Sequence, residues 1–246
     1  MPRIVLLIHG EKSYLAAAEA EINTQFGRIS TKGITGKKLP TIIKSSTGEE
    51  FIAMQPAITD FLRKAGRGPQ IIAPKDIGAL IGAIGIAPGW RVLDAGTGSG
   101  FLSMFLANIV YPGTVYTYEK SNEFFKIAEK NIKKFGFTNI ILKNEDVFNA
   151  KEQELDLVTL DMEGAEKFVK IAHEKLRPGG WLVVYSLHIE QVQAVFKEMK
   201  KYYSQLRIFE TLQRDWQIEG TKKLFTRPRT HMLAHTGWWV IGRRCD

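Results

Sequence analysis

The sequence has a single cysteine, Cys245, next to the end of its 246 residues. One cysteine excludes a disulfide within the chain and any zinc site built from several cysteines. We therefore expect no metal site and a reducing, cytoplasmic environment.

Long apolar runs are also absent. The N-terminal run Ile4–Ile8 is followed by His9 and Glu11, and nothing elsewhere reaches the ~18 uncharged residues of a membrane span. We expect no export signal, no transmembrane helix and no membrane partner. Glycine (22) and proline (9) are too few for a collagen-like or low-complexity chain, and the 44% hydrophobic content favours a folded core.

Positive charge is concentrated near the C-terminus. The chain has 34 basic and 26 acidic residues, a formal net charge of +8. Residues 66–196 are almost neutral, with 14 basic and 15 acidic side chains, whereas residues 197–246 have 11 and 5. This imbalance indicates a polyanionic partner, although lysine-rich surfaces are also solvated faces that bind nothing.

Two regions differ in their periodicity. Residues 1–55 contain short alternating runs separated by glycines, which predict a small β-rich N-terminal domain. A linking helix is expected near residues 56–65, after Pro56. Helix and strand patterns then alternate, so residues 56–246 are predicted to form an α/β domain with a doubly wound, mostly parallel sheet.

The expected elements of this second region follow from apolar spacing. The expected helices cover Pro74–Ile86, Phe101–Val110, Glu123–Phe135, Ala165–Leu176 and Gln191–Tyr203. The expected strands cover Arg91–Asp94, Gly113–Glu119, Ile140–Lys143, Leu155–Leu160 and Trp181–Leu187. A turn is expected at Arg177–Gly180, and the last section predicts two strands, Leu206–Gln217 and Thr236–Gly242, joined by a basic loop.

The most specific motif is a glycine-rich turn between a strand and a helix. It reads Asp94-Ala95-Gly96-Thr97-Gly98-Ser99-Gly100. Glycine lets the backbone pass close to a ligand, and a nucleotide-like cofactor is implied. The spacing differs from the G-x-G-x-x-G of dinucleotide sites, because Phe101 takes the place of the third glycine. An acid two positions before the first glycine is typical of S-adenosylmethionine (SAM) sites, so Asp94 and Gly96 are candidate SAM residues.

Acidic residues follow three of the expected strands. Glu119 is the best candidate for the ribose hydroxyls, since it lies about 20 residues beyond the glycine turn. Asp146 is a candidate for an adenine amino group. Asp161 leaves an apolar strand towards the expected ligand cleft and is the leading catalytic acid or base; the alternative is that it only caps the following helix.

These residues resemble the tRNA (adenine-N1)-methyltransferases that modify T-loop adenosine 58 and, in some archaeal members, adenosine 57. The segment Arg67–Asp76 is similar to the one that precedes the family's SAM fold, and Asp94–Gly100 is similar to its glycine turn. Arg227-Pro228-Arg229 followed by His235-Thr236-Gly237 resembles its C-terminal signature. The family usually has a proline soon after the catalytic aspartate, where this chain reads Asp161-Met162-Glu163-Gly164-Ala165.

The resemblance implies a catalytic role for Asp161 and assembly as a homotetramer. It also implies SAM contacts from seven residues: Ile71, Gly98, Ser99, Gly100, Glu119, Asp146 and Val147.

The basic tail suits a tRNA substrate. Lys222, Lys223, Arg227 and Arg229 are candidate phosphate contacts. Trp216, Trp238 and His235 are candidates to stack on an extruded base, although Trp238 and Trp239 point to opposite faces of a strand and one of them belongs to a core. Two alternatives stay open: a SAM-dependent methyltransferase for a small molecule or a protein, and a catalytically inactive tRNA-binding homologue.

Overall fold

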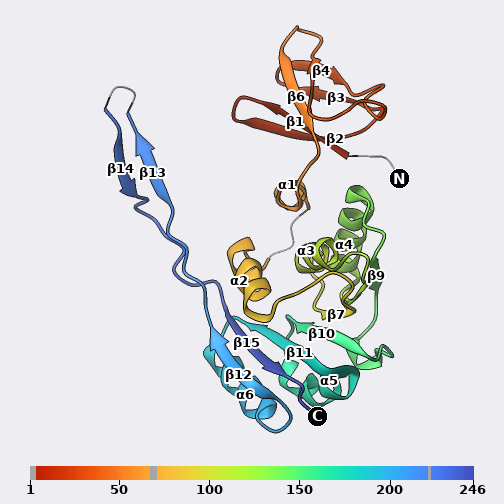
Figure 1. Cartoon of the computed structure of the whole chain (residues 1–246), viewed down its shortest axis with the longest axis vertical. Helices are drawn as coiled ribbons and strands as arrows, with labels where there is room; N and C mark the ends of the chain where they lie inside the picture. The colour runs from red at the N-terminus through yellow and green to blue at the C-terminus, as the bar shows by residue number, and fades with distance from the viewer. Residues whose placement is uncertain (1–3, 67–70, 221–222) are drawn as a thin grey trace.

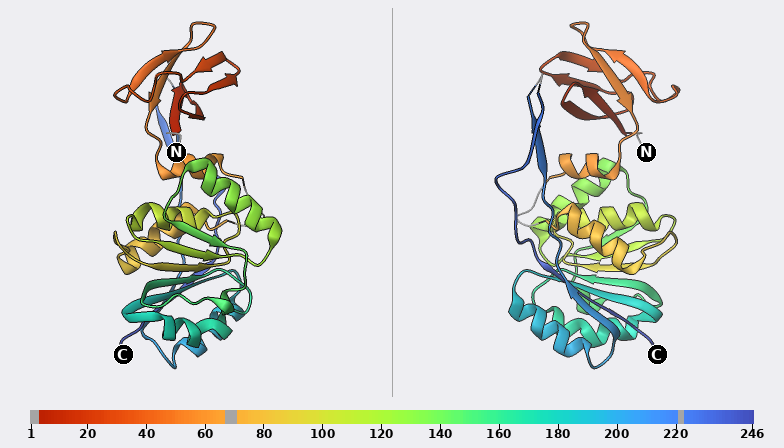
Figure 2. Two further views of the ribbon diagram at one scale, coloured as in Figure 1. Left: turned by 90° about the vertical axis from the view of Figure 1, so that its right-hand side faces the viewer. Right: turned by 60° about the vertical axis from the view of Figure 1, so that its left-hand side comes forward.

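The computed structural model describes residues 4–66, 71–220 and 223–246. It has a small β-rich module, an α/β domain and a two-stranded arm that extends from the α/β domain past α2 (Figures 1 and 2). Lys222, and the part of the family-like segment at residues 67–70, lie outside the described residues.

Six short strands build the N-terminal module. Four form an antiparallel sheet in the order β2-β1-β6-β5, and β3 pairs with β4 alone. Their bounds are β1 Ile4–His9, β2 Lys12–Ala17, β3 Glu21–Thr24, β4 Gly27–Ser30, β5 Thr41–Lys44 and β6 Glu50–Met54. Strand β3 has one apolar side chain, Ile22, and so shows no alternation from which a strand could be predicted.

Helix α1 (Ile58–Lys64) connects the module to the α/β domain and packs on its helices α3 and α4. The Phe61 ring stacks on the ring of Phe135 in α4, with centroids 4.8 Å apart. Because β1–β6 have their own core, we propose the boundary between the two domains at residues 55–56.

The α/β domain is built on a seven-stranded sheet in the order β12-β15-β11-β10-β7-β8-β9. The five strands from β11 to β9 are parallel, and β15 is antiparallel to both β11 and β12. The strands are β7 Val92–Ala95, β8 Val115–Tyr118, β9 Ile140–Lys143, β10 Leu155–Leu160, β11 Leu176–Ser186, β12 Ser204–Phe209 and β15 Trp238–Arg243. The predicted α/β, mostly parallel fold class is confirmed.

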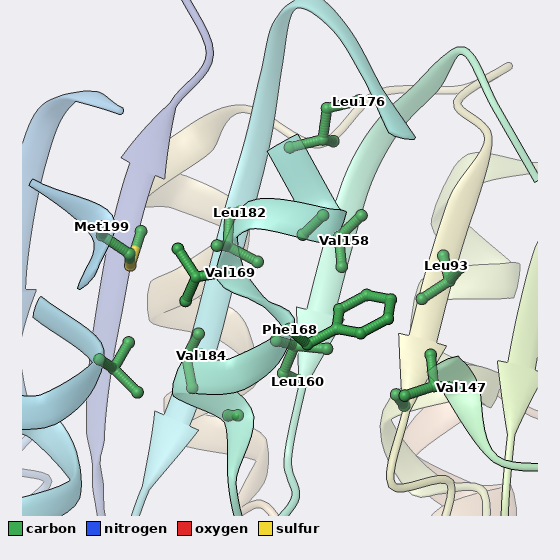
Figure 3. Packing of buried hydrophobic residues seen from close by; sticks show 14 of the residues in the cluster. Leu93, Val147, Val158, Leu160, Phe168, Val169, Leu176, Leu182, Val184 and Met199 are labelled. Carbon is green, nitrogen blue, oxygen red and sulfur yellow. The ribbon is translucent and has the colours of Figure 1, made fainter. Parts of the chain in front are cut away.

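Helices cover both faces of this sheet. They are α2 Pro74–Ile84, α3 Phe101–Val110, α4 Asn122–Phe135, α5 Val169–Lys175 and α6 Ile189–Met199, with short 3-10 turns η1 Val147–Asn149 and η2 Ala165–Phe168. Figure 3 shows one core, where Phe168, Val169 and Met199 meet the sheet residues Val158 and Leu182. Each such fully buried side chain contributes roughly 1.5–3 kcal/mol.

The predicted strand Leu206–Gln217 is correct only in its first part. Strand β12 ends at Phe209, and the chain then leaves the sheet for a hairpin of β13 (Trp216–Glu219) and β14 (Phe225–Pro228). The polar run Gln213–Asp215 has no apolar alternation that would keep it on the sheet. The hairpin and its two connections, residues 210–237, are called the arm below.

Other boundaries also differ from expectation. Arg177–Gly180 is part of β11 rather than a free turn, because Gly179 and Gly180 bond to the backbone of Arg244. The predicted helix Ala165–Leu176 is divided into η2 and α5, and the last predicted helix ends at Met199 instead of Tyr203.

Candidate active site

A cavity of about 360 Å³ opens at the carboxyl ends of β7, β8 and β10. This is the edge where open parallel sheets bind ligands, and the volume suits a small-molecule site. Its lining residues are Ala95, Gly96, Gly98, Ser99, Tyr118, Glu119, Lys120, Phe124, Glu145, Asp146, Val147, Phe148, Asp161, Met162 and Glu163.

The glycine turn forms one wall of the cavity. Gly96, Gly98 and Gly100 all have positive φ, at 83°, 55° and 83°, a region that L side chains rarely adopt. Gly100 is the N-cap of α3 and packs against Ala128 of α4. The turn therefore brings bare backbone to the cavity at the start of a helix.

Glu119 lies opposite the turn and is 6% exposed. Its Oε2 accepts a hydrogen bond from the Gly98 N–H and its Oε1 accepts one from the Ser121 N–H, each at 2.8 Å. Each carboxylate oxygen has a second lone pair, which a ribose hydroxyl can use. The burial and these bonds distinguish Glu119 from a surface glutamate.

Asp146 and Val147 also line the cavity. Val147 is buried, and the Asp146 carboxylate caps η1 by accepting the Phe148 N–H at 3.0 Å. Ile71 does not line the main cavity. It lines a smaller adjoining pocket together with Gly98, Ser99 and Asp161.

Asp94 lies beneath the turn and is not among the cavity-lining residues. Its carboxylate is 1% exposed and accepts hydrogen bonds from three hydroxyls, those of Ser103, Thr117 and Thr159, at 2.6–2.8 Å. Burial raises the pKa of Asp94, against the effect of these hydrogen bonds. The structure thus places Asp94 as a support that joins β7, β8, β10 and α3.

Asp161 directly follows β10 and lines both pockets. Its backbone N–H donates to the Ala95 carbonyl at 2.8 Å, which holds the residue beside β7. Burial, and then the charge of Asp94, raises its pKa to about 7. Gly164 is the residue that caps η2, so Asp161 is not the N-cap of the following helix.

Several lining residues escaped the sequence analysis. Glu145, Met162 and Glu163 sit beside the predicted acids in the sequence, so a wider window around Asp146 and Asp161 would have found them. Phe124 and Phe148 come from α4 and η1, and their apolar side chains carry no signal that separates cavity wall from core.

Three of the predicted phosphate contacts, Lys223, Arg227 and Arg229, are described and lie on the arm, apart from the lining of the cavity. Lys223 lies over the ring of Phe225, 5.4 Å from the centroid, and Arg227 pairs with Glu219 at 3.3 Å. Arg229 bonds through its backbone to Asp215.

His235 and three tryptophans complete the predicted substrate side. The His235 ring lies 4.1 Å from that of Trp238, centroid to centroid, beside the end of β11. Trp239 is 1% exposed and belongs to the core, as predicted for one of the pair, whereas Trp216 is 60% exposed on β13.

The cavity residues fit a SAM-like ligand. The Ser99 hydroxyl is buried and, within the described ranges, has no hydrogen-bond partner, as expected of a group that bonds to a ligand. Five carboxylates line the cavity against one lysine, Lys120, which suits a ligand with a sulfonium and an ammonium group.

Neither a candidate membrane span nor a candidate metal site occurs among the described residues. No helix among residues 4–66, 71–220 and 223–246 is long and apolar enough to cross a membrane. In the same ranges no three His, Cys, Asp or Glu residues are grouped so that they could hold a metal ion.

Comparisons with known proteins agree with this architecture. The chain is 31% identical to the tRNA (adenine(57)-N(1)/adenine(58)-N(1))-methyltransferase TrmI of Methanocaldococcus jannaschii, over 94% of this chain and 91% of that protein. A SAM-dependent O-methyltransferase from Thermotoga maritima matches with a TM-score of 0.80 and 27% identity, over 100% of this chain and 94% of that one. The tRNA (m1A58) methyltransferase TrmI of Aquifex aeolicus matches with a TM-score of 0.76 and 27% identity, over 99% and 97%.

A family model described as "tRNA methyltransferase complex GCD14 subunit" matches residues 63–231, from the linking helix α1 through most of the arm. This match spans more than half of the chain and includes the glycine turn, Glu119 and Asp161. The chain therefore belongs to the GCD14 family of tRNA methyltransferases.

Proposed function

We propose that this protein is a SAM-dependent tRNA (adenine-N1)-methyltransferase that modifies T-loop adenosine 58, and adenosine 57 as a second target. The main support for this proposal is the position of Asp161. Asp161 lines both the main cavity and the pocket of Ile71, and we propose that the methyl donor and the acceptor base meet beside it. Family membership supports tRNA as the substrate class.

We assign the main cavity to SAM, which supplies a methyl group already activated on a sulfonium. Glu119 holds the ribose hydroxyls, and Asp146 with Val147 holds the adenine. Ser99 and the backbone of Gly96–Gly100 hold the amino acid part. Asp94 acts indirectly, by fixing the strand and helix on either side of the turn.

Asp161 orients the target adenosine and balances the charge that develops on it. The N1 lone pair forms the new C–N bond as the C–S bond breaks, and the purine becomes cationic. In the described ranges no donor bonds to the Asp161 carboxylate, so it is free to accept the N6 amino group. A carboxylate about 4 Å from the cation offers roughly 4 kcal/mol at an effective dielectric constant of 20, or about a thousandfold in rate.

The arm supplies the RNA side of the site in this proposal. N1 lies on the pairing edge of the base, so the nucleotide must leave the tRNA fold to reach Asp161. Lys223, Arg227 and Arg229 contact phosphates, as we propose also for Lys222. His235 and Trp238, at the base of the arm, stack on the extruded purine.

We also propose that four copies of the chain assemble, with the arm as an interface. Cross-strand pairing puts Trp216 and Ile218 on one face of the hairpin with Thr226 and Pro228. Trp216 and Ile218 are 60% and 67% exposed, and another copy of this chain would cover them. The opposite face carries Arg227 and stays available to RNA.

The test is radiolabelled methyl transfer to unmodified tRNA, followed by mass spectrometry of the digested nucleosides. N1-methyladenosine mapped to position 58 or 57 supports the proposal. The similarity to a Thermotoga maritima O-methyltransferase keeps a second candidate, methylation of an oxygen on a small molecule or a protein. Label in such an acceptor and none in tRNA would favour it, and SAM binding without turnover would favour an inactive tRNA-binding homologue.

A further inference from the structure

We propose that Lys75 is a positioning residue for methyl transfer: its buried ammonium group fastens both ends of the arm to α2 beside the catalytic edge of the sheet. The inference rests on the proposed function, because it concerns how the arm and Asp161 are held in one geometry.

Both connections of the arm leave the sheet at the edge where Asp161 lies. Strand β15 is antiparallel to β11, and its first residue, Trp238, pairs with Ser186 at the carboxyl end of β11. Strand β12 ends at Phe209, opposite Trp239. A tilt of the arm about these two points would therefore move its charged face relative to the cavity.

Lys75 joins the two connections to each other. Its Nζ donates to the Thr211 carbonyl at 2.6 Å on the outgoing connection and to the Thr236 Oγ1 at 2.7 Å on the returning one. The third donation goes to the Asp76 Oδ1 at 2.7 Å. An ammonium has three N–H donors, so all of them are used.

The burial of Lys75 makes this arrangement informative. Its side chain is 11% exposed, whereas lysine is ordinarily at the surface. Burying it removes water and rotamer freedom, so the three acceptors must all be present. Lys75 therefore keeps all three hydrogen bonds only while both connections of the arm stay in their observed positions.

Asp76 links Lys75 to β11, the strand that pairs with β10 and so lies beside Asp161. Its Oδ2 accepts a hydrogen bond from the Tyr185 hydroxyl at 3.3 Å, and its carbonyl accepts the Trp239 Nε1–H at 3.0 Å. Tyr185 packs so closely on Gly237 that any Cβ there would overlap its ring. Burial, and the charges of Asp76 and Asp161 among other causes, raise the pKa of Tyr185.

The Thr236 hydroxyl allows a test that barely changes shape. Thr236→Val keeps the β-branched outline and removes the acceptor, whereas Thr236→Ser keeps the acceptor. Lys75→Met removes the ammonium, and Lys75→Met with Asp76→Asn also removes the carboxylate charge that would be left unpaired. The double variant replaces Lys75→Met in the measurements if Lys75→Met does not fold.

Two readouts are measured on each folded variant. The first is amide hydrogen exchange of residues 210–215 and 229–237, measured without RNA. The second is the kcat for tRNA methylation together with the Kd for SAM. We expect Thr236→Val and Lys75→Met to speed exchange of both connections and to lower kcat at least tenfold, with the Kd for SAM within twofold of wild type and Thr236→Ser close to wild type.

If Lys75 only stabilises the fold, its replacement should lower Tm and leave the kcat of the folded protein unchanged. That result would overturn the proposal. Unchanged exchange in Thr236→Val would overturn it as well. The exchange measurement needs no substrate. If the wild-type protein does not methylate tRNA, the proposed function is wrong. The exchange measurement would still show whether Lys75 fastens the arm.

Discussion

Gly96 packs directly against the backbone of Asp161, so closely that a Cβ on Gly96 would overlap the Asp161 carbonyl. The first glycine of the turn and the candidate catalytic acid are thus one structural unit, although 65 positions separate them in the sequence. Any displacement of the turn is passed to Asp161.

Gly96→Ala should abolish SAM binding and destabilise the protein by several kcal/mol, because it adds an overlap to a strained φ of 83°. Gly78→Ala is the matched control. Gly78 lies inside α2 with nothing within 4 Å of an added Cβ, so alanine should raise stability by up to about 1 kcal/mol. Thermal unfolding and calorimetric SAM titration compare the two, and SAM binding by Gly96→Ala would contradict the close contact.

Methyl transfer should rise with pH as Asp161 ionises, with a midpoint near its pKa of about 7. Asp161→Asn should bind SAM, lose activity by about 10²–10⁴-fold and show no such rise. Since the folded pKa of about 7 lies above the ordinary value of 3.8, the native state keeps a proton that the unfolded state has lost between these values, so Asp161 costs stability progressively from pH 3.8 to about 7 and by a constant amount above it. Asp161→Asn should therefore raise Tm at pH 8 more than at pH 5; near-normal turnover would remove Asp161 from the mechanism.

Glu119→Gln should weaken SAM binding by roughly 10–100-fold, the loss expected for charge-assisted hydrogen bonds. Glu123→Gln makes the same change on an exposed glutamate in the first turn of α4, outside the cavity lining, and should leave the affinity unchanged. Isothermal titration of SAM distinguishes the two. Equal affinities for both variants would show that Glu119 serves only its bonds to Gly98 and Ser121.

Replacing Lys223, Arg227 and Arg229 by alanine should weaken tRNA binding and reduce its dependence on salt, because fewer counterions are released. The charge-matched control replaces Lys167, Lys170 and Lys197, exposed lysines on η2, α5 and α6. Binding measured from 50 to 300 mM salt should give a lower slope only for the arm variant. If the two slopes agree, the arm cations are simply solvated.

Trp216→Gln combined with Ile218→Thr should reduce the assembly size seen by light scattering, because these side chains form the apolar face of the arm. Gln217→Ser on the opposite face should leave the size unchanged. Each chain should still fold, since neither residue lies in a core, and far-UV circular dichroism checks this. A monomeric wild-type protein would exclude the arm as an interface between copies.

Much of the fold and site is visible in the sequence because it depends on neighbours in the chain. The glycine turn has positive φ at Gly96, Gly98 and Gly100. Glycine adopts this backbone conformation at little energetic cost, so the turn can be predicted from the residue types alone. Glu119 and Asp161 each follow an apolar strand, and parallel strands end at one edge, so these acids had to lie around one cavity. The excess of basic residues after position 197 marks the arm only in part, since five of the 11 lie between residues 210 and 237.

The tertiary structure alone decided the rest. Asp94 looked like a ligand residue and proved to be buried among Ser103, Thr117 and Thr159, whose hydroxyls come from separate elements. Lys75 bonds to residues 136 and 161 positions away in the chain. No local pattern encodes such contacts, because they exist only where the order of strands in the sheet brings distant segments to the same edge.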